Sequence, residues 1–230
     1  GLRYRIEASG EGQLWPEAVP DRIAWAAALA TSALTFILVR MDGYDPVSLI
    51  ATFLIACLFL ATAWREPVFE GLALVAAFLS LSVVAAWYLP AIADWPQFTH
   101  DYRGTGYAGA VGPVVPPQLS AFVVVSVAFG ALFGGAGFLA LARARRPALW
   151  AGVSAGVPVS LLAVAYWRVT GLGIDLAWSA AAFGVTGIAL TAAAQIRRRP
   201  PRGGGANDDL LLAIYALAGI AALGLAFAMA

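Results

Sequence analysis

Seven long stretches of the sequence are almost free of charged residues, and this pattern constrains the fold more than any other feature. They cover residues 23–39, 47–63, 68–89, 119–142, 148–167, 174–195 and 210–230. Stretches of about 17–25 apolar residues cross the ~30 Å hydrocarbon core of a bilayer as α-helices. Apolar residues lie all around each predicted helix, as in helices that face lipid. We therefore predict an all-α fold, a polytopic transmembrane bundle or array of helical hairpins with about seven spans.

The composition supports a membrane environment. The chain is 61% hydrophobic and 12% charged, whereas about 25% of the residues of a soluble domain are charged. We therefore expect the lipid bilayer, rather than water, to cover most of the surface. The net charge of +1 gives no reason to expect nucleic acid as a partner. The single cysteine, Cys57, lies in an apolar stretch, so we expect no disulfide within the chain, and no motif predicts a cofactor or a metal.

The arginines predict the orientation. All fourteen basic residues are arginine, and only Arg40, Arg103 and Arg168 lie in connections on one predicted side of the membrane. The other eleven lie on the opposite side, which the positive-inside rule assigns to the cytoplasm. The N-terminus is then cytoplasmic. The use of arginine without lysine, with abundant alanine and glycine, is typical of a GC-rich bacterial genome, so we expect a multi-pass protein of the bacterial inner membrane.

These spans divide the chain into six segments. The chain begins without methionine and ends in an apolar stretch, so we expect an internal piece of a longer polypeptide whose last span is truncated. Further transmembrane helices of that chain would then be partners. The predicted segments are a cytoplasmic juxtamembrane segment (1–22), spans 1–3 (23–89), a long outer, periplasmic loop (90–118), spans 4–6 (119–195), a cytoplasmic linker rich in Arg, Pro and Gly (196–209) and span 7 (210–230).

The interior of the predicted spans carries small residues instead of charges. No ionisable residue lies in the middle of a span, although ion-coupled transporters usually need one there. Glycines crowd the fourth and fifth spans, namely Gly130, Gly134, Gly135, Gly137, Gly152 and Gly156. Small residues let helix backbones approach closely, so we favour helix packing over a ligand groove at these positions. Pro158 is expected to kink the fifth span.

Polar residues gather on the predicted outer face. The candidates for a site there are Asp42, Asp45, Asp94, His100, Asp101 and Arg103. The carboxylates and the histidine could converge on a divalent cation, or on a phosphate-bearing lipid through it. Alternatively, the histidine could act as a general base that a neighbouring carboxylate orients. Acidic residues in such a turn most often form the turn itself and cap a helix, and a bland surface loop is the favoured interpretation.

Parts of the chain resemble a known bacterial family. The resemblance rests on the Trp64–Pro67 turn, on the stretch from Leu119 through Arg146 and on the ending DDLLLAIYALAGIAALGLAFAMA. These features are similar to the multi-pass membrane proteins of domain of unknown function 2339. The resemblance implies a long protein with many more helices than seven, of which this chain is an internal segment. It implies no functional residues.

Three classes of function stay open on the sequence alone. The first is a non-enzymatic membrane scaffold or envelope-associated component, which the lack of buried charge and of any motif favours. The second is a transporter or flippase of a lipid-like substrate, which needs a continuous path of Ser and Thr side chains between spans. The third is a transferase that acts at the outer face on a lipid-linked substrate. That reaction requires the outer carboxylates and His100 to lie within a few ångströms of one another.

Overall fold

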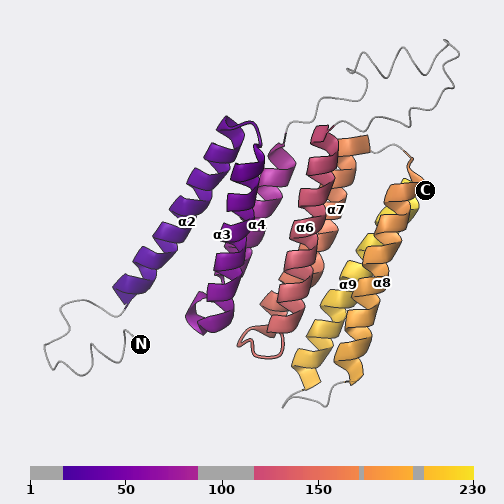
Figure 1. Cartoon of the computed structure of the whole chain (residues 1–230). Coiled ribbons are helices and arrows are strands. Elements are labelled where there is room, and N and C mark those ends of the chain that lie inside the picture. The colour runs from indigo at the N-terminus through magenta and orange to yellow at the C-terminus, as the bar shows by residue number, and fades with distance from the viewer. Residues whose placement is uncertain (1–17, 88–116, 171–173, 199–204) are drawn as a thin grey trace, which may run out of the picture.

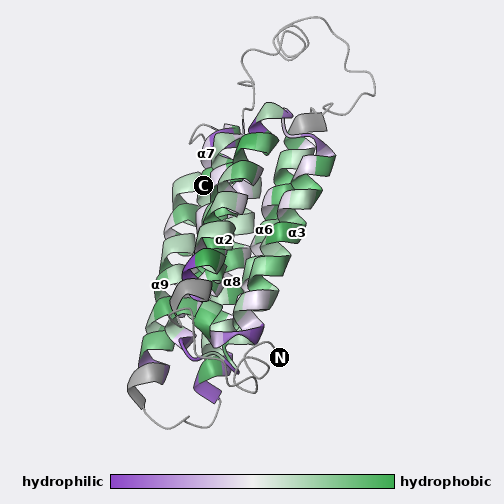
Figure 2. Cartoon of the chain, turned by 90° about the vertical axis from the view of Figure 1, so that its left-hand side faces the viewer, coloured by the Kyte–Doolittle hydropathy of each residue, from purple (hydrophilic) through white to green (hydrophobic). Residues whose placement is uncertain are grey.

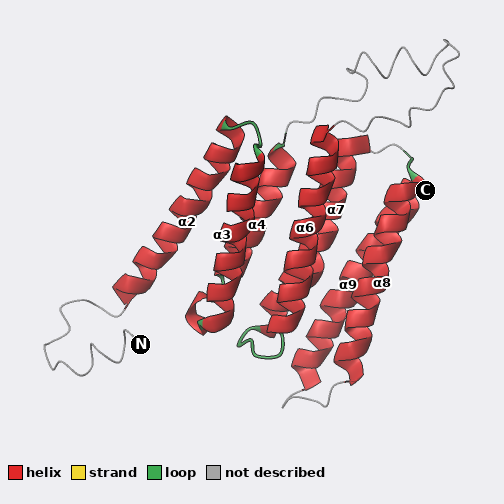
Figure 3. Ribbon diagram, in the orientation of Figure 1, coloured by secondary structure: helices red, strands yellow, loops and turns green. Residues whose placement is uncertain are grey.

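The computed structural model describes residues 18–87, 117–170, 174–198 and 205–230, and all regular structure in these ranges is helical (Figures 1 and 3). The elements are α2 (Ala18–Met41), α3 (Pro46–Arg65), the 3₁₀ helix η1 (Pro67–Phe69), α4 (Leu72–Ala86), α6 (Pro117–Ala140), α7 (Pro147–Thr170), α8 (Leu176–Arg198) and α9 (Gly205–Met229). The predicted all-α bundle of about seven spans is confirmed. Six of the helices are long and apolar enough to cross a membrane, as expected of an integral membrane protein.

Helix α4 differs from its predicted span. The stretch 68–89 was expected to form one long helix, but η1 takes up its beginning and α4 has 15 residues. At a rise of 1.5 Å per residue, α4 is about 22 Å long, shorter than the ~30 Å core. More than half of its residues are buried, because α2, α3, α6 and α7 all contact it. Neighbouring helices therefore cover most of α4, while Leu74 and Phe78 stay exposed.

The helices run in alternating directions and form two groups in chain order. Helices α2, α3 and α4 make the first group; in the second, α7 contacts α6 and α9, and α8 packs mainly on α9. Colouring by hydropathy shows green along the helices and purple near their ends (Figure 2). Helices α3, α6 and α8 end on the same side of the bundle, and we call this side the arginine end. Its described arginines, beyond Arg22 at the start of α2, are Arg65, Arg143, Arg145, Arg146, Arg197 and Arg198.

Proline and polar caps set the ends of the helices. Pro46 occupies the first turn of α3, and Pro147 begins α7 directly after an arginine-rich turn. Proline suits a first turn because its missing N–H would have no partner there. Pro67 instead begins η1. Arginine followed closely by proline thus precedes a long helix at Pro147 but only a short 3₁₀ turn at Pro67.

Two of the glycines make α6 and α7 approach closely. A Cβ on Gly137 would lie 2.8 Å from the Cβ of Ser154 and 3.0 Å from its Cα, so only hydrogen fits. A Cβ on Gly134 would lie 3.5 Å from the Cγ of Pro158, an ordinary contact. The expected packing through small residues is present at both positions. Gly135 and Gly152, in contrast, have nothing within 4 Å of an added Cβ.

Replacing Gly137 by alanine should separate α6 from α7. Because the new methyl group meets backbone atoms of Ser154, the helices must move apart, and overpacking of this kind costs about 1–3 kcal/mol. Gly135→Ala is the matched control, since it gains the same helix propensity in open space. The measurement is the free energy of unfolding in mixed detergent micelles. Equal stabilities of the two variants would show that Gly137 is not a contact point.

Candidate functional site

The turn between α2 and α3 holds two of the predicted site residues. The carboxylate of Asp45 accepts a hydrogen bond from the backbone N–H of Val47 at 2.9 Å and caps α3. The carboxylate of Asp42 accepts one from the hydroxyl of Ser48 at 2.6 Å. The interpretation of Asp45 as a helix cap is confirmed. Both carboxylates are engaged in holding the turn against the start of α3.

The other four candidates lie outside the described residues. Asp94, His100, Asp101 and Arg103 fall between α4 and α6 in the range 88–116. Their convergence with Asp42 and Asp45 therefore stays a prediction. Within the described ranges, no group of three or more His, Cys, Asp or Glu side chains is placed to hold a metal ion.

An aromatic cluster at the same end joins the α2–α3 turn to three helices. The ring of Tyr44 stacks on Trp87 with a centroid distance of 4.8 Å, and Trp87 meets the edge of Phe122 at 5.5 Å. The guanidinium of Arg168, in the last turn of α7, donates to the backbone carbonyl of Trp87. The cluster therefore ties the α2–α3 turn to the ends of α4 and α7 and to the start of α6.

Two polar atoms of this cluster are buried without a partner among the described residues. They are the hydroxyl oxygen of Tyr44 and Nε of Arg168. Burial removes the phenol from water, which favours its neutral form and raises the pKa of Tyr44, although the nearby guanidinium groups of Arg40 and Arg168 lower it. The cluster is thus a neutral aromatic stack beside two cations.

A buried carboxylate joins two turns at the arginine end. Glu70, which is 3% exposed, follows η1 and accepts hydrogen bonds from the backbone N–H groups of Arg145 and Arg146 at 2.7 and 3.0 Å. Hydrogen bonds to a charged acceptor are stronger than neutral ones. Close by in the sequence, Arg143 lies over the ring of Trp64 at 5.8 Å. Glu70 of the α3–α4 connection and Arg143 of the α6–α7 turn therefore hold these two connections together.

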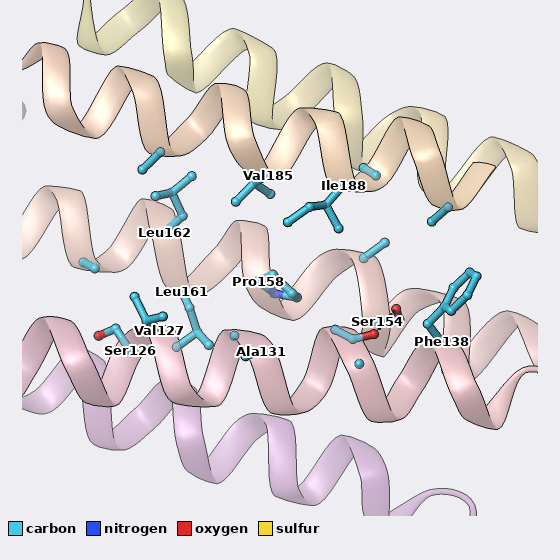
Figure 4. A pocket seen from close by; sticks show the side chains of 18 of the residues that line it. Ser126, Val127, Ala131, Phe138, Ser154, Pro158, Leu161, Leu162, Val185 and Ile188 are labelled. Atoms are coloured by element: carbon cyan, nitrogen blue, oxygen red, sulfur yellow. Dashed lines mark hydrogen bonds between the residues drawn. The ribbon is translucent and has the colours of Figure 1, made fainter. Parts of the chain in front are cut away.

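A groove of about 830 Å³ runs between α6 and α8 with α7 as its floor. Figure 4 shows the three helices side by side, with Val127 and Ala131 on α6, Pro158 and Leu161 on α7, and Val185 on α8. Most of the side chains that face it are apolar or small. Helix α9 contributes one lining residue, Tyr215. A space of this size would hold a bound group, so the groove is the candidate functional site.

A chain of hydrogen bonds crosses the groove floor. The hydroxyl of Tyr215 on α9 donates to the hydroxyl oxygen of Ser154 on α7 at 2.8 Å, and Ser154 donates to the carbonyl of Gly134 on α6 at 2.9 Å. Pro158, one turn further along α7, has no N–H for the carbonyl of Ser154. Ser154 therefore links three helices at the point where α7 itself lacks one internal hydrogen bond.

The other hydroxyl groups along the groove are satisfied within their own helices. Ser126 donates to the carbonyl of Phe122 at 2.8 Å, and Thr191 donates to that of Ile188 at 2.8 Å. Such back-bonding removes the hydroxyl hydrogen from any contact with a ligand. The groove therefore presents an apolar surface although Ser, Thr and Tyr line parts of it.

Sequence reasoning found parts of this arrangement and missed others. Helix packing by Gly134 and Gly137 was predicted, but the groove beside them was not favoured, and Gly130, Gly134 and Gly135 line it. The bridge from Glu70 was also missed, because its partners are 75 and 76 residues away in the sequence. Hydropathy alone carries no signal for either feature.

No family model, curated protein or solved structure matches this chain. The resemblance to domain of unknown function 2339 is therefore neither supported nor contradicted by these comparisons.

Removing the carboxylate of Glu70 should destabilise the arginine end. In Glu70→Ala the backbone N–H groups of Arg145 and Arg146 lose their charged acceptor, at about 1.5–3 kcal/mol for each hydrogen bond. The stability of Glu70→Gln should fall between those of Glu70→Ala and the natural sequence. Its amide oxygen can still accept one hydrogen bond, whereas its NH₂ group faces the second N–H and cannot. Amide hydrogen exchange of Arg145 and Arg146 should quicken in the same order.

The control for this experiment is Glu66→Gln, four residues earlier on an exposed side chain. It should leave both the exchange rates and the free energy of unfolding unchanged. Unaltered exchange in Glu70→Ala would contradict the bridge.

Proposed function

We propose that the chain is a membrane scaffold, a helical bundle that packs against other membrane segments without chemistry of its own. One observation carries this proposal. Every buried Ser, Thr and Glu side chain among the described residues makes a hydrogen bond to the backbone, namely Thr35, Thr52, Glu70, Ser80, Ser126, Ser154, Ser179 and Thr186. Only the hydroxyl of Tyr44 and Nε of Arg168, in the aromatic cluster, are buried without a partner among the described residues. Buried groups that serve catalysis or transport are usually left available to a substrate or an ion.

Three of these side chains connect different parts of the bundle. Glu70 joins two turns, Ser154 joins α7 to α6, and Ser179 on α8 donates to the carbonyl of Ala226 on α9 at 2.8 Å. The other five donate within their own helix. The three that reach beyond their own helix hold parts of the bundle together, which is the property that a scaffold needs.

The transporter and transferase alternatives receive less support. A path for a lipid-like substrate would use free hydroxyl groups between spans, whereas the groove hydroxyls of Ser126 and Thr191 are bonded to their own helices. A transferase at the opposite end would depend on Asp94, His100 and Asp101, which lie outside the described residues, and Asp45 serves as a helix cap. The scaffold is therefore our preferred function.

We further propose where the scaffold lies. The arginine end faces the cytoplasm of a bacterium, because arginine-rich connections are retained on that side, and the membrane is the inner membrane. The chain would be an internal segment of a longer protein of the domain of unknown function 2339 type, whose other transmembrane helices are its neighbours. The arginine-rich turns and the stretch from Leu119 through Arg146 support this assignment.

Complementation of a deletion strain tests the scaffold function. A variant that neutralises the loop candidates, Asp94→Asn with His100→Gln and Asp101→Asn, should restore growth under detergent stress as well as the natural sequence does. Gly137→Leu, which must separate α6 from α7, should not. Failure of the neutralised variant, expressed at the natural level, would favour the transferase and end the scaffold proposal.

Cysteine labelling tests the orientation. Met41 is 78% exposed and lies at the side of the bundle opposite the arginine end. In a Cys57→Ala background, a cysteine in its place should react with a membrane-impermeant maleimide added to whole cells. A cysteine in place of Arg197 should react only after the membrane is opened. Labelling of the second site in intact cells would reverse the proposed orientation.

A further inference from the structure

We infer that the groove between α6 and α8 is a docking site for one further transmembrane α-helix, whose end beside the arginine end carries carboxylates. The inference rests on the proposed scaffold function and names the class of partner. The groove lies on the surface that the bundle shows to lipid, over α7 and between two helices that border it on either side (Figure 4). Its length, its lining and the charges at one end identify the occupant.

The length of the groove distinguishes a helix from a lipid chain. Lining residues on α6 extend from Val123 to Phe138 and those on α8 from Ala177 to Gln195. At 1.5 Å per residue, these stretches are about 22 and 27 Å long. The hydrocarbon core is ~30 Å thick, so one leaflet is about 15 Å. An acyl chain is confined to its leaflet, whereas a transmembrane helix follows the whole groove.

The volume agrees with a helix that is half enclosed. A helix with side chains is about 10–12 Å across, so a 22 Å length of it fills roughly 1,700–2,500 Å³. The groove of about 830 Å³ would then hold about a third to a half of that helix. The remainder would face lipid, as the outer surfaces of α6 and α8 do. A partly enclosed helix is the ordinary arrangement at the edge of a membrane bundle.

The sides of the groove are built for close approach of a backbone. On α6, Gly130 and Gly135 line the groove, and a Cβ on either would meet nothing within 4 Å. On α8, Ala177 and Ala181 line it one turn apart. Small residues at such spacings let a second helix come near, so that van der Waals contact replaces the missing hydrophobic driving force. Ala177 and Ala181 are exposed in the described bundle.

The charges at one end set the orientation of the occupant. Gln195 is the last groove residue on α8, and the exposed Arg197 and Arg198 follow it in the last turn. Neither arginine makes an ion pair within the described residues. Exposed pairs contribute little to affinity but favour one arrangement over its reverse. Arg198 comes seven residues after Thr191 and three after Gln195, so it continues the groove face of α8. Carboxylates on the docked helix at this end would meet its guanidinium group.

Photocross-linking in phosphatidylcholine vesicles tests the inference on the complete chain. The probe is a synthetic helix of about 20 leucines and alanines with a benzophenone side chain at its centre and a pair of glutamates at each end. We expect the cross-links to fall on groove residues of α6 and α8. A second probe with lysine pairs in place of glutamates should cross-link less.

Two double variants, one in the groove and one away from it, test whether the apolar lining of the groove binds the helix. Gly135→Leu with Ala181→Leu fills the groove and should lower the cross-linking yield by about fivefold or more. Gly224→Leu with Ala180→Leu makes the same changes on exposed helix positions away from the groove lining and should leave the yield unchanged. Equal yields in both pairs, or labels spread evenly over the lipid-facing helices, would overturn the docking site.

A second pair tests the charges. Arg197→Gln with Arg198→Gln should lower the yield of the glutamate probe to that of the lysine probe, whereas Arg22→Gln with Arg65→Gln, on α2 and α3, should not. No difference between these pairs would overturn the predicted carboxylates.

A lipid occupant and a failed scaffold give results of their own. If a phospholipid with a photoreactive acyl chain labels the groove in preference to both peptides, and the leucine pair abolishes that label, the occupant is lipid and the inference is wrong. If the leucine pair in the groove also complements the deletion strain fully, docking fails while the scaffold stands. Loss of complementation by the neutralised loop variant would instead refute the scaffold itself.

Discussion

Every polar group that is removed from both water and lipid head groups needs a partner within the protein, and the described bundle depends on this constraint. Helices satisfy the backbone, so only side chains and turns need further partners. Glu70 shows the most demanding case, because a carboxylate that is 3% exposed would be costly without its two backbone donors. These hydrogen bonds join the α3–α4 connection to the α6–α7 turn at the arginine end.

At the opposite end, stacked aromatic rings join the helices. Tyr44, in the turn before α3, stacks on Trp87 after α4, and Arg168 of α7 donates to the carbonyl of that tryptophan. Between the two ends, Ser154 links α6, α7 and α9. The bundle is thus tied at three depths. The groove between α6 and α8 lies over the Ser154 link.

The sequence predicted the class of fold because hydropathy is a local property. Each long apolar stretch formed a helix over most of its length. The stretch 68–89 was the exception, since α4 is shorter than a span and other helices cover most of it. Apolar composition alone does not distinguish a helix that faces lipid from one that faces protein.

The proposed site shows a similar limit of sequence-based prediction. Glycines predict close packing, but not which of them face a neighbour.

By itself, the sequence determined that the chain folds as apolar helices, where most of them end, and that charges gather at those ends, because these properties depend on residues that are near one another. Only the tertiary structure decided that Glu70 meets a turn 75 residues away, that Gly137 touches Ser154, and that Gly135 borders an open groove. The physical reason is that lipid is as apolar as leucine, so hydrophobicity places a helix in the membrane without choosing its neighbours. Shape and hydrogen bonds make that choice, and both arise only when distant segments meet.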